Sequence, residues 1–272
     1  MKKIVFITGA SSGIGAALAR EYAQQGAVLG LLARRQTQLE ALCAALPNAD
    51  AHRLYAVDVN DHQALQRAAE DFLAHHGKAH VVIASAGISV GTLTGCEGDL
   101  AVFEQVVNTN LIATAASFAP FIAAMRETAV SEPCRLVGIA SVAGIRGLPG
   151  AEAYSASKAA VISYCESLRV ELKSSGIRVV TIAPGYIDTP MTQINTYPMP
   201  FLMPVEKFAR QAVRTIEAGR SYRVIPWQMA WVARLLRLLP DWLYDAVLMR
   251  APHKARAGER KSDGRNDEYG GV

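Results

Sequence analysis

The stretch TGASSGIG, residues 8–15, constrains the fold more than any other part of the chain. It follows the apolar run IVFIT and leads directly into a helical pattern, GIGAALAREYAQQ. Gly9, Gly13 and Gly15 permit a tight turn and close packing of the strand on the helix, so a pyrophosphate can lie against the unpaired N–H groups at the helix N-terminus. The loop therefore predicts a dinucleotide-binding site. Its other residues are Ala10, Ser11, Ser12 and Ile14.

Six further β-branched runs alternate with alanine-rich helical patterns along the chain. These runs are AVLGLLA, HRLYAVDV, KAHVVIASAG, RLVGIAS, IRVVTIAP and YRVIP. Strands and helices that alternate at this spacing form βαβ units, and such apolar strands are typical of a parallel sheet covered on both faces. We therefore predict a Rossmann-type, doubly wound α/β fold, which is a three-layer sandwich with a seven-stranded parallel sheet.

The predicted elements divide the chain into three parts. Residues 1–225 carry the whole alternating pattern and are expected to form one NAD(P)-binding catalytic domain. Residues 226–250 are expected to form an amphipathic helical extension, and residues 251–272 a basic, disordered tail. No linker rich in Pro, Gly or Ser interrupts the first part.

Composition and charge exclude several classes of protein. A net charge of +4 over 272 residues is too small and too dispersed to indicate nucleic-acid binding. The four cysteines, at positions 43, 96, 134 and 165, lack metal-ligand spacing and are typical of buried thiols in a reducing compartment, so no metal site is predicted. The apolar run Ile4 to Ile7 is shorter than a signal-peptide core of about 7 to 15 residues, so we expect a cytoplasmic protein.

Residues after the second and third predicted strands indicate which dinucleotide binds. Ala33 stands where a reader of the ribose 2′-hydroxyl normally supplies Asp or Glu, and Arg34 and Arg35 follow it. Two guanidinium groups without a carboxylate suit a 2′-phosphate, so NADP(H) is predicted in preference to NAD(H). Arginines that merely face water remain the alternative. Asp58 and Val59 are placed to meet the adenine, Asp58 through a hydrogen bond to its amino group.

Tyr154 and Lys158 lie four positions apart in the predicted helix AYSASKAAV, so they share one face of it. A nearby ammonium favours the phenolate and is expected to lower the tyrosine pKa from about 10 toward neutrality, which suits a general acid or base. Such a pair also occurs by chance on many helices. Ser141 adds weight because it ends a predicted strand, at the edge where open α/β sheets bind ligands. Its hydroxyl can hold a carbonyl oxygen beside the tyrosine.

Together these residues resemble the short-chain dehydrogenase/reductase family, in its short single-domain branch. The resemblance covers about residues 4–225. It is carried by the glycine loop 8–15, Asp58, Asn110, Ser141, the Tyr154-x-x-x-Lys158 pair, Pro184, Gly185 and Thr189. It implies hydride transfer between the nicotinamide C4 and a carbonyl or alcohol carbon, with Tyr154 donating or removing the proton on oxygen.

The resemblance also implies a role for each matched residue. Lys158 would hold the nicotinamide ribose and bias the tyrosine, while Ser141 would orient and polarise the substrate oxygen. The backbone carbonyl of Asn110 would hold a water that links Lys158 to solvent as a proton relay. The implied contacts to the nicotinamide come from Pro184, Gly185, Ile187 and, on the carboxamide, Thr189.

One motif departs from the family pattern. The usual Asn-Asn-Ala-Gly after the fourth strand reads Ala84-Ser85-Ala86-Gly87 here. The small Ala86-Gly87, expected to lie against the cofactor, is kept, but the asparagines that tie neighbouring strands are missing. We expect a less rigid edge of the sheet at this point and a retained activity.

The long connection YIDTPMTQINTYPMPFLMP follows the sixth strand and is predicted to form a lid over the substrate. Its apolar residues suit a hydrophobic carbonyl or alcohol substrate, such as a 3-oxoacyl, lipid-derived or steroid-like compound, with packing into the protein's own core as the alternative. These residues are Met191, Ile194, Tyr197, Met199, Phe201, Leu202 and Met203. Arg146 is the one candidate reader of an anionic group, unless it faces water.

The extension 226–250 places several tryptophans and leucines on one helical face and breaks at Pro240. Such a segment can cap the cleft, form a subunit interface or lie on a membrane surface. The family resemblance implies a homodimer or homotetramer, which an exposed apolar segment suits, and peripheral membrane contact is the alternative for this segment.

Two other functions stay open. One is a non-catalytic NADP(H)-binding redox sensor or scaffold, which the intact catalytic residues disfavour. The other is a nucleotide-sugar epimerase or dehydratase, which the glycine spacing and the lack of a sizeable C-terminal substrate domain disfavour.

Overall fold

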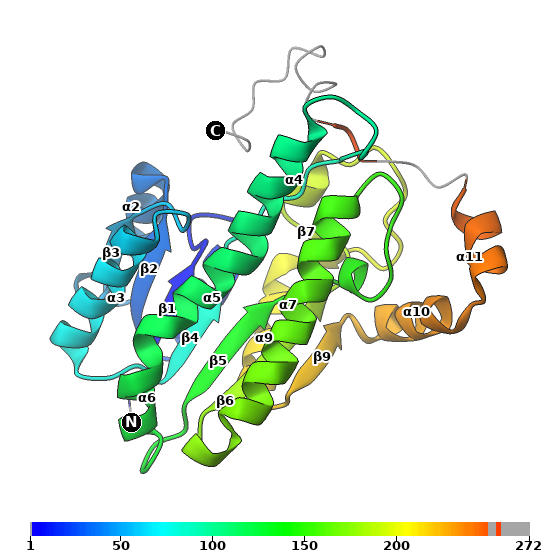
Figure 1. Ribbon diagram of the computed structural model, residues 1–272. Coiled ribbons are helices and arrows are strands. Elements are labelled where there is room, and N and C mark those ends of the chain that lie inside the picture. Colours follow the sequence, from blue (N-terminus) through cyan, green and yellow to red (C-terminus); the bar gives the residue numbers. More distant parts are fainter. Residues whose placement is uncertain (1, 250–253, 257–272) are drawn as a thin grey trace.

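The computed structural model describes residues 2–249 and 254–256. Seven parallel strands form the central sheet, in the order β3-β2-β1-β4-β5-β6-β9 (Figure 1). Their bounds are β1 Ile4–Thr8, β2 Val28–Ala33, β3 Arg53–Ala56, β4 Val81–Ala84, β5 Arg135–Ile139, β6 Arg178–Pro184 and β9 Tyr222–Ile225. All seven predicted strands are present, and the doubly wound parallel sheet is confirmed.

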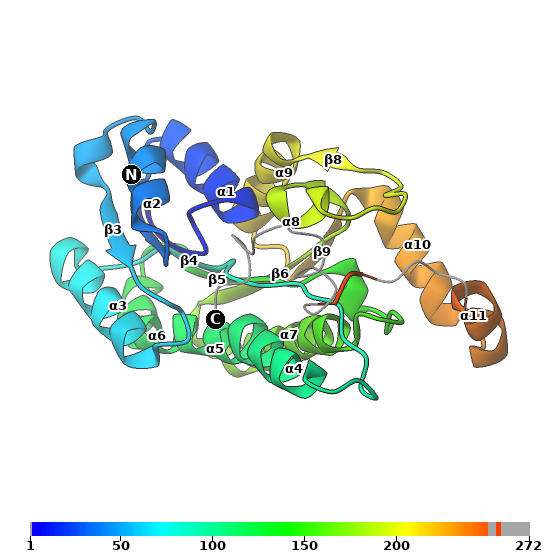
Figure 2. The same ribbon diagram turned by 90° about the horizontal axis from the view of Figure 1, so that it is seen from above.

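Helices cover both faces of the sheet (Figure 2). One layer contains α1 Gly13–Gln24, α2 Gln36–Ala44 and α9 Val205–Glu217. The other contains α3 His62–His76, α4 Asp99–Val107, α5 Ala113–Phe118, α6 Ile122–Thr128 and α7 Glu152–Glu171. Because both faces are covered, the inner strands β1, β2, β4 and β5 are buried along their whole length, which explains their unbroken apolar runs.

The chain order in the sheet reverses next to β1, since β2 pairs on one side of it and β4 on the other. The loops that leave β1 and β4 therefore separate to opposite faces of the sheet. This topological switch point is the place where open α/β sheets bind ligands, outside the carboxyl ends of the strands.

One helical stretch, Asp99–Thr128, is long and apolar enough to cross a membrane by length and composition. Here it packs on the sheet, and its Phe118, Phe121 and Met125 are fully buried. We therefore describe it as a core element of the sandwich.

The connection predicted as a lid contains regular structure of its own. A two-stranded sheet joins β7 Ile187–Asp188 to β8 Met203–Pro204, and the short helix α8 Pro190–Gln193 lies between them. Thr189 caps this helix reciprocally with Thr192.

Two helices follow the sheet, as predicted for the extension. They are α10 Trp227–Leu238 and α11 Asp241–Leu248, and they lie beside the edge formed by β9 (Figures 1 and 2). The predicted disordered tail, 251–272, falls outside the described residues except for Lys254–Arg256, which pair with Gly91.

Candidate active site

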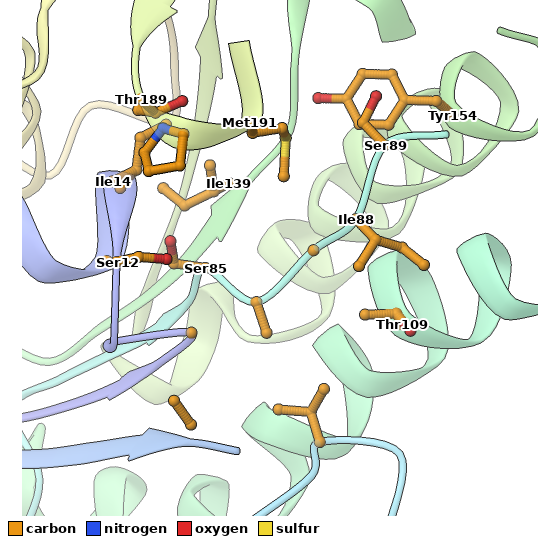
Figure 3. A pocket seen from close by; sticks show the side chains of 18 of the residues that line it. Ser12, Ile14, Ser85, Ile88, Ser89, Thr109, Ile139, Tyr154, Thr189 and Met191 are labelled. Atoms are coloured by element: carbon orange, nitrogen blue, oxygen red, sulfur yellow. The ribbon is translucent and has the colours of Figure 1, made fainter. Parts of the chain in front are cut away.

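A cavity of about 610 Å³ runs along the carboxyl ends of the central strands. Every residue predicted for catalysis or cofactor binding lines it except Asn110. Figure 3 shows Ser12 and Ile14 at one end, and Tyr154 and Ser89 together at the other. The cavity thus brings the glycine loop and the tyrosine helix, which are far apart in the sequence, to one place.

The loop after β1 has a backbone that requires glycine. Gly9 and Gly13 have φ values of 67° and 53°, which lie in the left-handed region that L side chains rarely adopt. A Cβ on Gly9 would lie 2.7 Å from the Cα of Ala86, and one on Gly15 only 2.2 Å from the carbonyl oxygen of Gly9. The glycines therefore let the β1 loop, the β4 loop and the start of α1 approach closely.

Arg35 crosses this loop. Its Nη2 donates to Ser11 Oγ at 3.1 Å and to Ser12 Oγ at 2.8 Å. Arg34 Nη1 lies 3.8 Å from Asp58 Oδ2, and both of these side chains are partly exposed. The two guanidinium groups thus stand at the end of β2, between the glycine loop and the end of β3.

Asp58 and Val59 follow β3, and both line the cavity. Asp58 Oδ1 accepts the backbone N–H of Asn60 at 2.9 Å, and Asn60 Nδ2 donates to Thr109 Oγ1 at 3.1 Å. These bonds tie the β3 loop to the helical segment after α4. Sequence reasoning did not select Asn60 or Thr109, although both line the cavity.

Thr8 partly replaces the missing asparagines. Its buried hydroxyl accepts long hydrogen bonds from the backbone N–H groups of Ser85, at 3.3 Å, and Ala86, at 3.4 Å. Thr8 ends β1 and the two amides follow β4, so one side chain ties the neighbouring strands together. The expected loss of rigidity at this edge is offset by a residue in the adjacent strand.

Tyr154 lies near the start of α7, and Ser141 ends the segment after β5. Ser141 is buried, and its Oγ accepts the Ala143 N–H at 3.1 Å. Removal of the tyrosine from bulk water raises its pKa above the ordinary value, and a hydrogen bond with Ser141 acts in the opposite direction. The predicted lowering of the Tyr154 pKa is therefore wrong for the free protein.

The position of Lys158 explains that difference. Its Nζ donates to the carbonyl of Ile139 at 2.9 Å and lies 5.8 Å from the centre of the Tyr154 ring. The ammonium is thus directed at the end of β5, and burial of the phenol outweighs its influence. Burial also lowers the pKa of Lys158 to about 8, because the charged form loses its hydration.

Asn110 lies behind the cavity, in a π-helical turn, Asn108–Ile112. Its Oδ1 accepts the Ile88 N–H at 2.8 Å, and its Nδ2 donates to the Ile88 carbonyl at 3.0 Å and to Ser157 Oγ at 2.9 Å. Its backbone carbonyl accepts from Thr114 Oγ1 at 2.8 Å. The asparagine side chain therefore joins the β4 loop to α7, a role that a sequence motif alone does not reveal.

The lid contributes only part of its apolar set to the cavity. Met191 and Ile194 line it, whereas Met203 packs into the core next to α9. Phe201 and Leu202 are about half exposed. The apolar residues of this segment are therefore divided between the cavity wall, the core and the surface, and its role as a lid stays a prediction.

Arg146 does not line the cavity, and its side chain is mostly shielded from water. It donates to the carbonyls of Leu236 and Leu239 at the end of α10, forms an ion pair with Asp241 at 2.9 Å, and stacks 3.7 Å from the centre of the Tyr244 ring. The prediction of an anion reader is wrong, because the guanidinium satisfies the last carbonyls of a helix that the sequence pattern could not place.

Several lining residues were not predicted. On the helix after the β4 loop, Val102, Gln105 and Thr109 face the cavity at helical spacing. Ile88, Ser89 and Val90 form the wall of the β4 loop. No sequence signal marks these residues, because only the packing of α4 beside α7 directs them inward.

The described residues contain no cluster of His, Cys, Asp and Glu that could hold a metal.

Comparison with known proteins gives one matching family, two similar relatives and one similar crystal structure. Residues 3–197 match the family described as "short chain dehydrogenase". An "uncharacterized oxidoreductase" of Myxococcus xanthus is 34% identical over 249 residues, which cover 91% of this chain and 97% of the relative. An "11-beta-hydroxysteroid dehydrogenase-like 3" of Arabidopsis thaliana is 30% identical over 88% of this chain and 78% of that relative. The crystal structure of a 3-ketoacyl-(acyl-carrier-protein) reductase from Brucella melitensis, complexed with NADH, is similar in fold, with a TM-score of 0.75 at 24% identity over 82% of this chain and 96% of that one.

Proposed function

The chain belongs to the short-chain dehydrogenase/reductase family and is an NAD(P)-dependent oxidoreductase of alcohol or carbonyl groups; from this premise we propose that it uses NADP(H) to interconvert a ketone and a secondary alcohol on a hydrophobic substrate. The proposal has two parts, the cofactor and the substrate class. Each rests on its own set of residues in the cavity.

The arrangement of Arg34 and Arg35 supports NADP(H). Ala33 supplies no carboxylate to a ribose 2′-hydroxyl, and the two guanidinium groups flank the end of β2 that faces the glycine loop. A 2′-phosphate accepts hydrogen bonds from guanidinium in a bidentate geometry and compensates its charge. Ser11 and Ser12, which accept hydrogen bonds from Arg35, are compatible with either dinucleotide. We therefore assign the preference for NADP(H) over NAD(H) to the two arginines.

The cavity fits a nicotinamide dinucleotide in other respects. A Cβ on Gly87 would lie 3.1 Å from Asn110 Oδ1 and 3.5 Å from Lys158 Nζ, so this position leaves space beside the lysine only as glycine. We assign the pyrophosphate to the N-terminus of α1, the adenine to Asp58 and Val59, and the nicotinamide to the cavity walls made by Pro184, Gly185, Ile187 and Thr189. The bound nicotinamide supplies or accepts the hydride.

The protein's own residues would hold and move a proton. Tyr154, protonated because its pKa is raised, donates to the substrate oxygen during reduction and must be deprotonated for oxidation. Ser141 orients that oxygen beside the phenol. Lys158 holds a positive charge next to the cleft, which stabilises the tyrosinate that remains after proton transfer.

Apolar residues around Tyr154 support a hydrophobic substrate. Ile88, Val90, Val102, Met191 and Ile194 line the cavity, and methionine adapts its shape to irregular ligands. We propose a 3-oxoacyl, lipid-derived or steroid-like carbonyl compound on this ground. The similarity to the Arabidopsis relative agrees with that class.

The first test is the fall in NADPH absorbance, with NADH as the parallel cofactor, against a panel of apolar ketones, 3-oxoacyl thioesters and steroids. Replacing Arg34 and Arg35 by Ala should raise the KM for NADPH by about ten- to a hundredfold and leave the KM for NADH little changed, because only the 2′-phosphate contacts are lost. Arg67→Ala, an exposed arginine on α3, is the matched control. Equal use of NADH by the unmodified protein would refute the cofactor proposal.

The apolar face of α10 and α11 supports proposals about partners. Trp227, Trp231, Leu235, Leu238 and Trp242 are each more than 60% exposed, and no residue of these two helices is among those that line the cavity. We therefore set aside the cleft-cap alternative and propose that this face joins subunits into a homodimer or homotetramer. Light scattering of the intact protein and of a Trp231→Ser, Leu235→Ser variant tests it, with a monomeric intact protein as the contrary outcome.

Peripheral membrane contact through 226–250 is the competing proposal for the same face, in an otherwise cytoplasmic protein. Flotation with anionic phospholipid vesicles, with and without the two serine substitutions, distinguishes it. Binding that survives the substitutions would end the membrane proposal.

A further inference from the structure

Residues Lys254–Arg256 lie against the β4 loop that forms one wall of the cavity. Arg256 pairs with Gly91 in a parallel bridge, and the Gly91 N–H donates to the carbonyl of Ala255 at 3.2 Å. A Cβ on Gly91 would lie 2.0 Å from the carbonyl oxygen of Lys254. Backbone therefore packs directly on backbone, between two segments that are more than 160 positions apart in the sequence.

An ion pair fastens these residues. Arg256 Nε lies 2.9 Å from Asp99 Oδ2, and Arg256 Nη2 donates to Asp99 Oδ1 at 3.3 Å. Asp99 is only 6% exposed, and its Oδ2 also accepts the Leu93 N–H at 2.8 Å. The arginine holds the pKa of this carboxyl group below its usual range. A buried carboxylate with two such partners fixes the start of α4, the β4 loop and the C-terminal residues together.

The fastened loop reaches the catalytic helix. The Thr92 N–H donates to the carbonyl of Gly150 at 3.3 Å, and the Ala153 N–H donates to Thr92 Oγ1 at 3.3 Å. Ala153 immediately precedes Tyr154. Lys254 Nζ also bonds to Ser89 Oγ at 2.8 Å, and Ser89 lines the cavity at the same end as Tyr154 (Figure 3).

We propose that Lys254, Ala255 and Arg256 are positioning residues for the reaction: through the Arg256–Asp99 ion pair they hold the wall 88–92 against the helix that carries Tyr154, and so set the size of substrate that the cavity admits. This inference rests on the proposed carbonyl–alcohol activity. It adds a determinant in the C-terminal part of the chain, after the segment of residues 3–197 that matches the family.

Three variants test whether the contact between Lys254–Arg256 and the β4 loop matters, apart from the charge of Arg256. Arg256→Ala removes the ion pair and Arg256→Lys keeps the charge. Gly91→Ala leaves both charged residues intact and pushes the Lys254 carbonyl away, since the added Cβ has no room there. Gly95→Ala is the matched control, because it lies in the same loop and its Cβ would meet nothing within 4 Å. Arg220→Ala, an exposed arginine, is the control for loss of charge.

The first readout is hydrogen exchange, which does not depend on any activity. In Arg256→Ala and Gly91→Ala we expect exchange of the peptide covering 89–95 to accelerate by about tenfold. The Gly91 amide loses the Ala255 carbonyl, and the Asp99 carboxylate that accepts the Leu93 amide loses the arginine that holds it in place. Exchange at Ile88 should stay slow, because its amide is held by Asn110. Unchanged exchange over 89–95 in both variants overturns the proposal, whether or not a substrate has been found.

The second readout is a kinetic split on a substrate that the unmodified protein turns over. We expect kcat/KM for the carbonyl substrate to fall by roughly ten- to a hundredfold in Arg256→Ala and Gly91→Ala, with partial recovery in Arg256→Lys. The dissociation constant for NADPH and the melting temperature should change little. A uniform loss of cofactor affinity and of melting temperature would indicate a merely structural contact and refute the positioning role. If the unmodified protein turns over no substrate, the proposed function is refuted. The hydrogen-exchange result then decides by itself whether Lys254–Arg256 hold the wall 88–92.

Discussion

Lys158 Nζ donates to the backbone carbonyl of Ile139 at 2.9 Å, at the point where β5 ends and the segment leading to Ser141 begins. The side chain is only 5% exposed, and burial lowers its pKa to about 8. The protein therefore keeps a poorly solvated ammonium at the edge of its sheet. Such a group is costly for stability and is typical of a functional site.

Lys158→Met should stabilise the free protein at neutral pH. A pKa of about 8 in place of 10.5 corresponds to about 3 kcal/mol of destabilisation by the buried charge, of which the lost hydrogen bond to Ile139 offsets about 1 kcal/mol. Below pH 8 the lysine is protonated in both the folded and unfolded states, so the full cost applies. Between about 8 and 10.5 only the unfolded state keeps the proton, so the stability of the unmodified protein rises with pH and the advantage of the variant shrinks.

Denaturant unfolding of both proteins across this pH range measures the difference. Lys173→Met, an exposed lysine after the same helix, is the control and should show no such pH dependence. A variant that is less stable than the parent protein at neutral pH would contradict the prediction.

Tyr154→Phe should lower kcat by about three orders of magnitude. The dissociation constant for NADPH should stay within a few-fold of the value for the unmodified protein. In the proposed mechanism the phenol acts on the transition state as a general acid, whereas the proposed cofactor contacts come mainly from the glycine loop and the arginines. Steady-state kinetics and fluorescence titration with NADPH measure the two effects. Retention of full activity would instead favour a non-catalytic role for this residue and revive the sensor interpretation.

The raised pKa of Tyr154 has its own spectroscopic test. In the free protein, the absorbance difference between the parent and Tyr154→Phe should show phenolate only at a higher pH than an exposed tyrosine does, because burial disfavours the charged ring. A phenolate signal near neutral pH would show that Lys158 controls the tyrosine, as its spacing alone suggested.

The glycine loop, the seven parallel strands and the cavity residues of the family motifs follow closely from sequence patterns. Gly9 and Gly13 have positive φ in the turn between a strand and a helix, and apolar runs that alternate with helical patterns are typical of a parallel sheet covered on both faces. Local spacing decides these features, so they are predictable without knowledge of the tertiary contacts.

The features that were missed depend on contacts between distant segments. Arg146 bonds to residues 90 or more positions away, and Arg256 pairs with Asp99 over 157 positions. The direction of Lys158 depends on a carbonyl in β5, which helical spacing with Tyr154 does not reveal. Burial and packing, rather than motif chemistry, decide these interactions and the sign of the Tyr154 pKa shift.

Ser157→Ala should loosen the attachment of Asn110 to α7, the helix that carries Tyr154. Ser157 Oγ accepts from Asn110 Nδ2 at 2.9 Å and donates to the Tyr154 carbonyl at 2.8 Å, and the serine is 1% exposed. Its loss leaves a buried amide donor with one partner fewer, at a cost of about 1–3 kcal/mol in the free energy of unfolding. Denaturant unfolding checks this, with Ser163→Ala, an exposed serine on the same helix, expected to change stability by less than about 0.5 kcal/mol. A loss no larger than that of the control would contradict the assigned bond.

Arg146→Ala should release α10 and α11 from the loop that follows Ser141. The guanidinium bonds to two carbonyls at the end of α10, pairs with Asp241 and stacks on Tyr244, so one substitution removes four contacts. Limited proteolysis should then cut the extension about tenfold faster, since local opening requires less free energy. Arg234→Ala is the control. This arginine is exposed on α10, and the contact described for it is with the ring of Trp231 on the same helix. Equal cleavage rates in the two variants would mean that the other contacts hold the extension in place, namely the apolar packing of Met229 and the hydrogen bonds of Arg237 to Ile145 and of Tyr244 to Gly147.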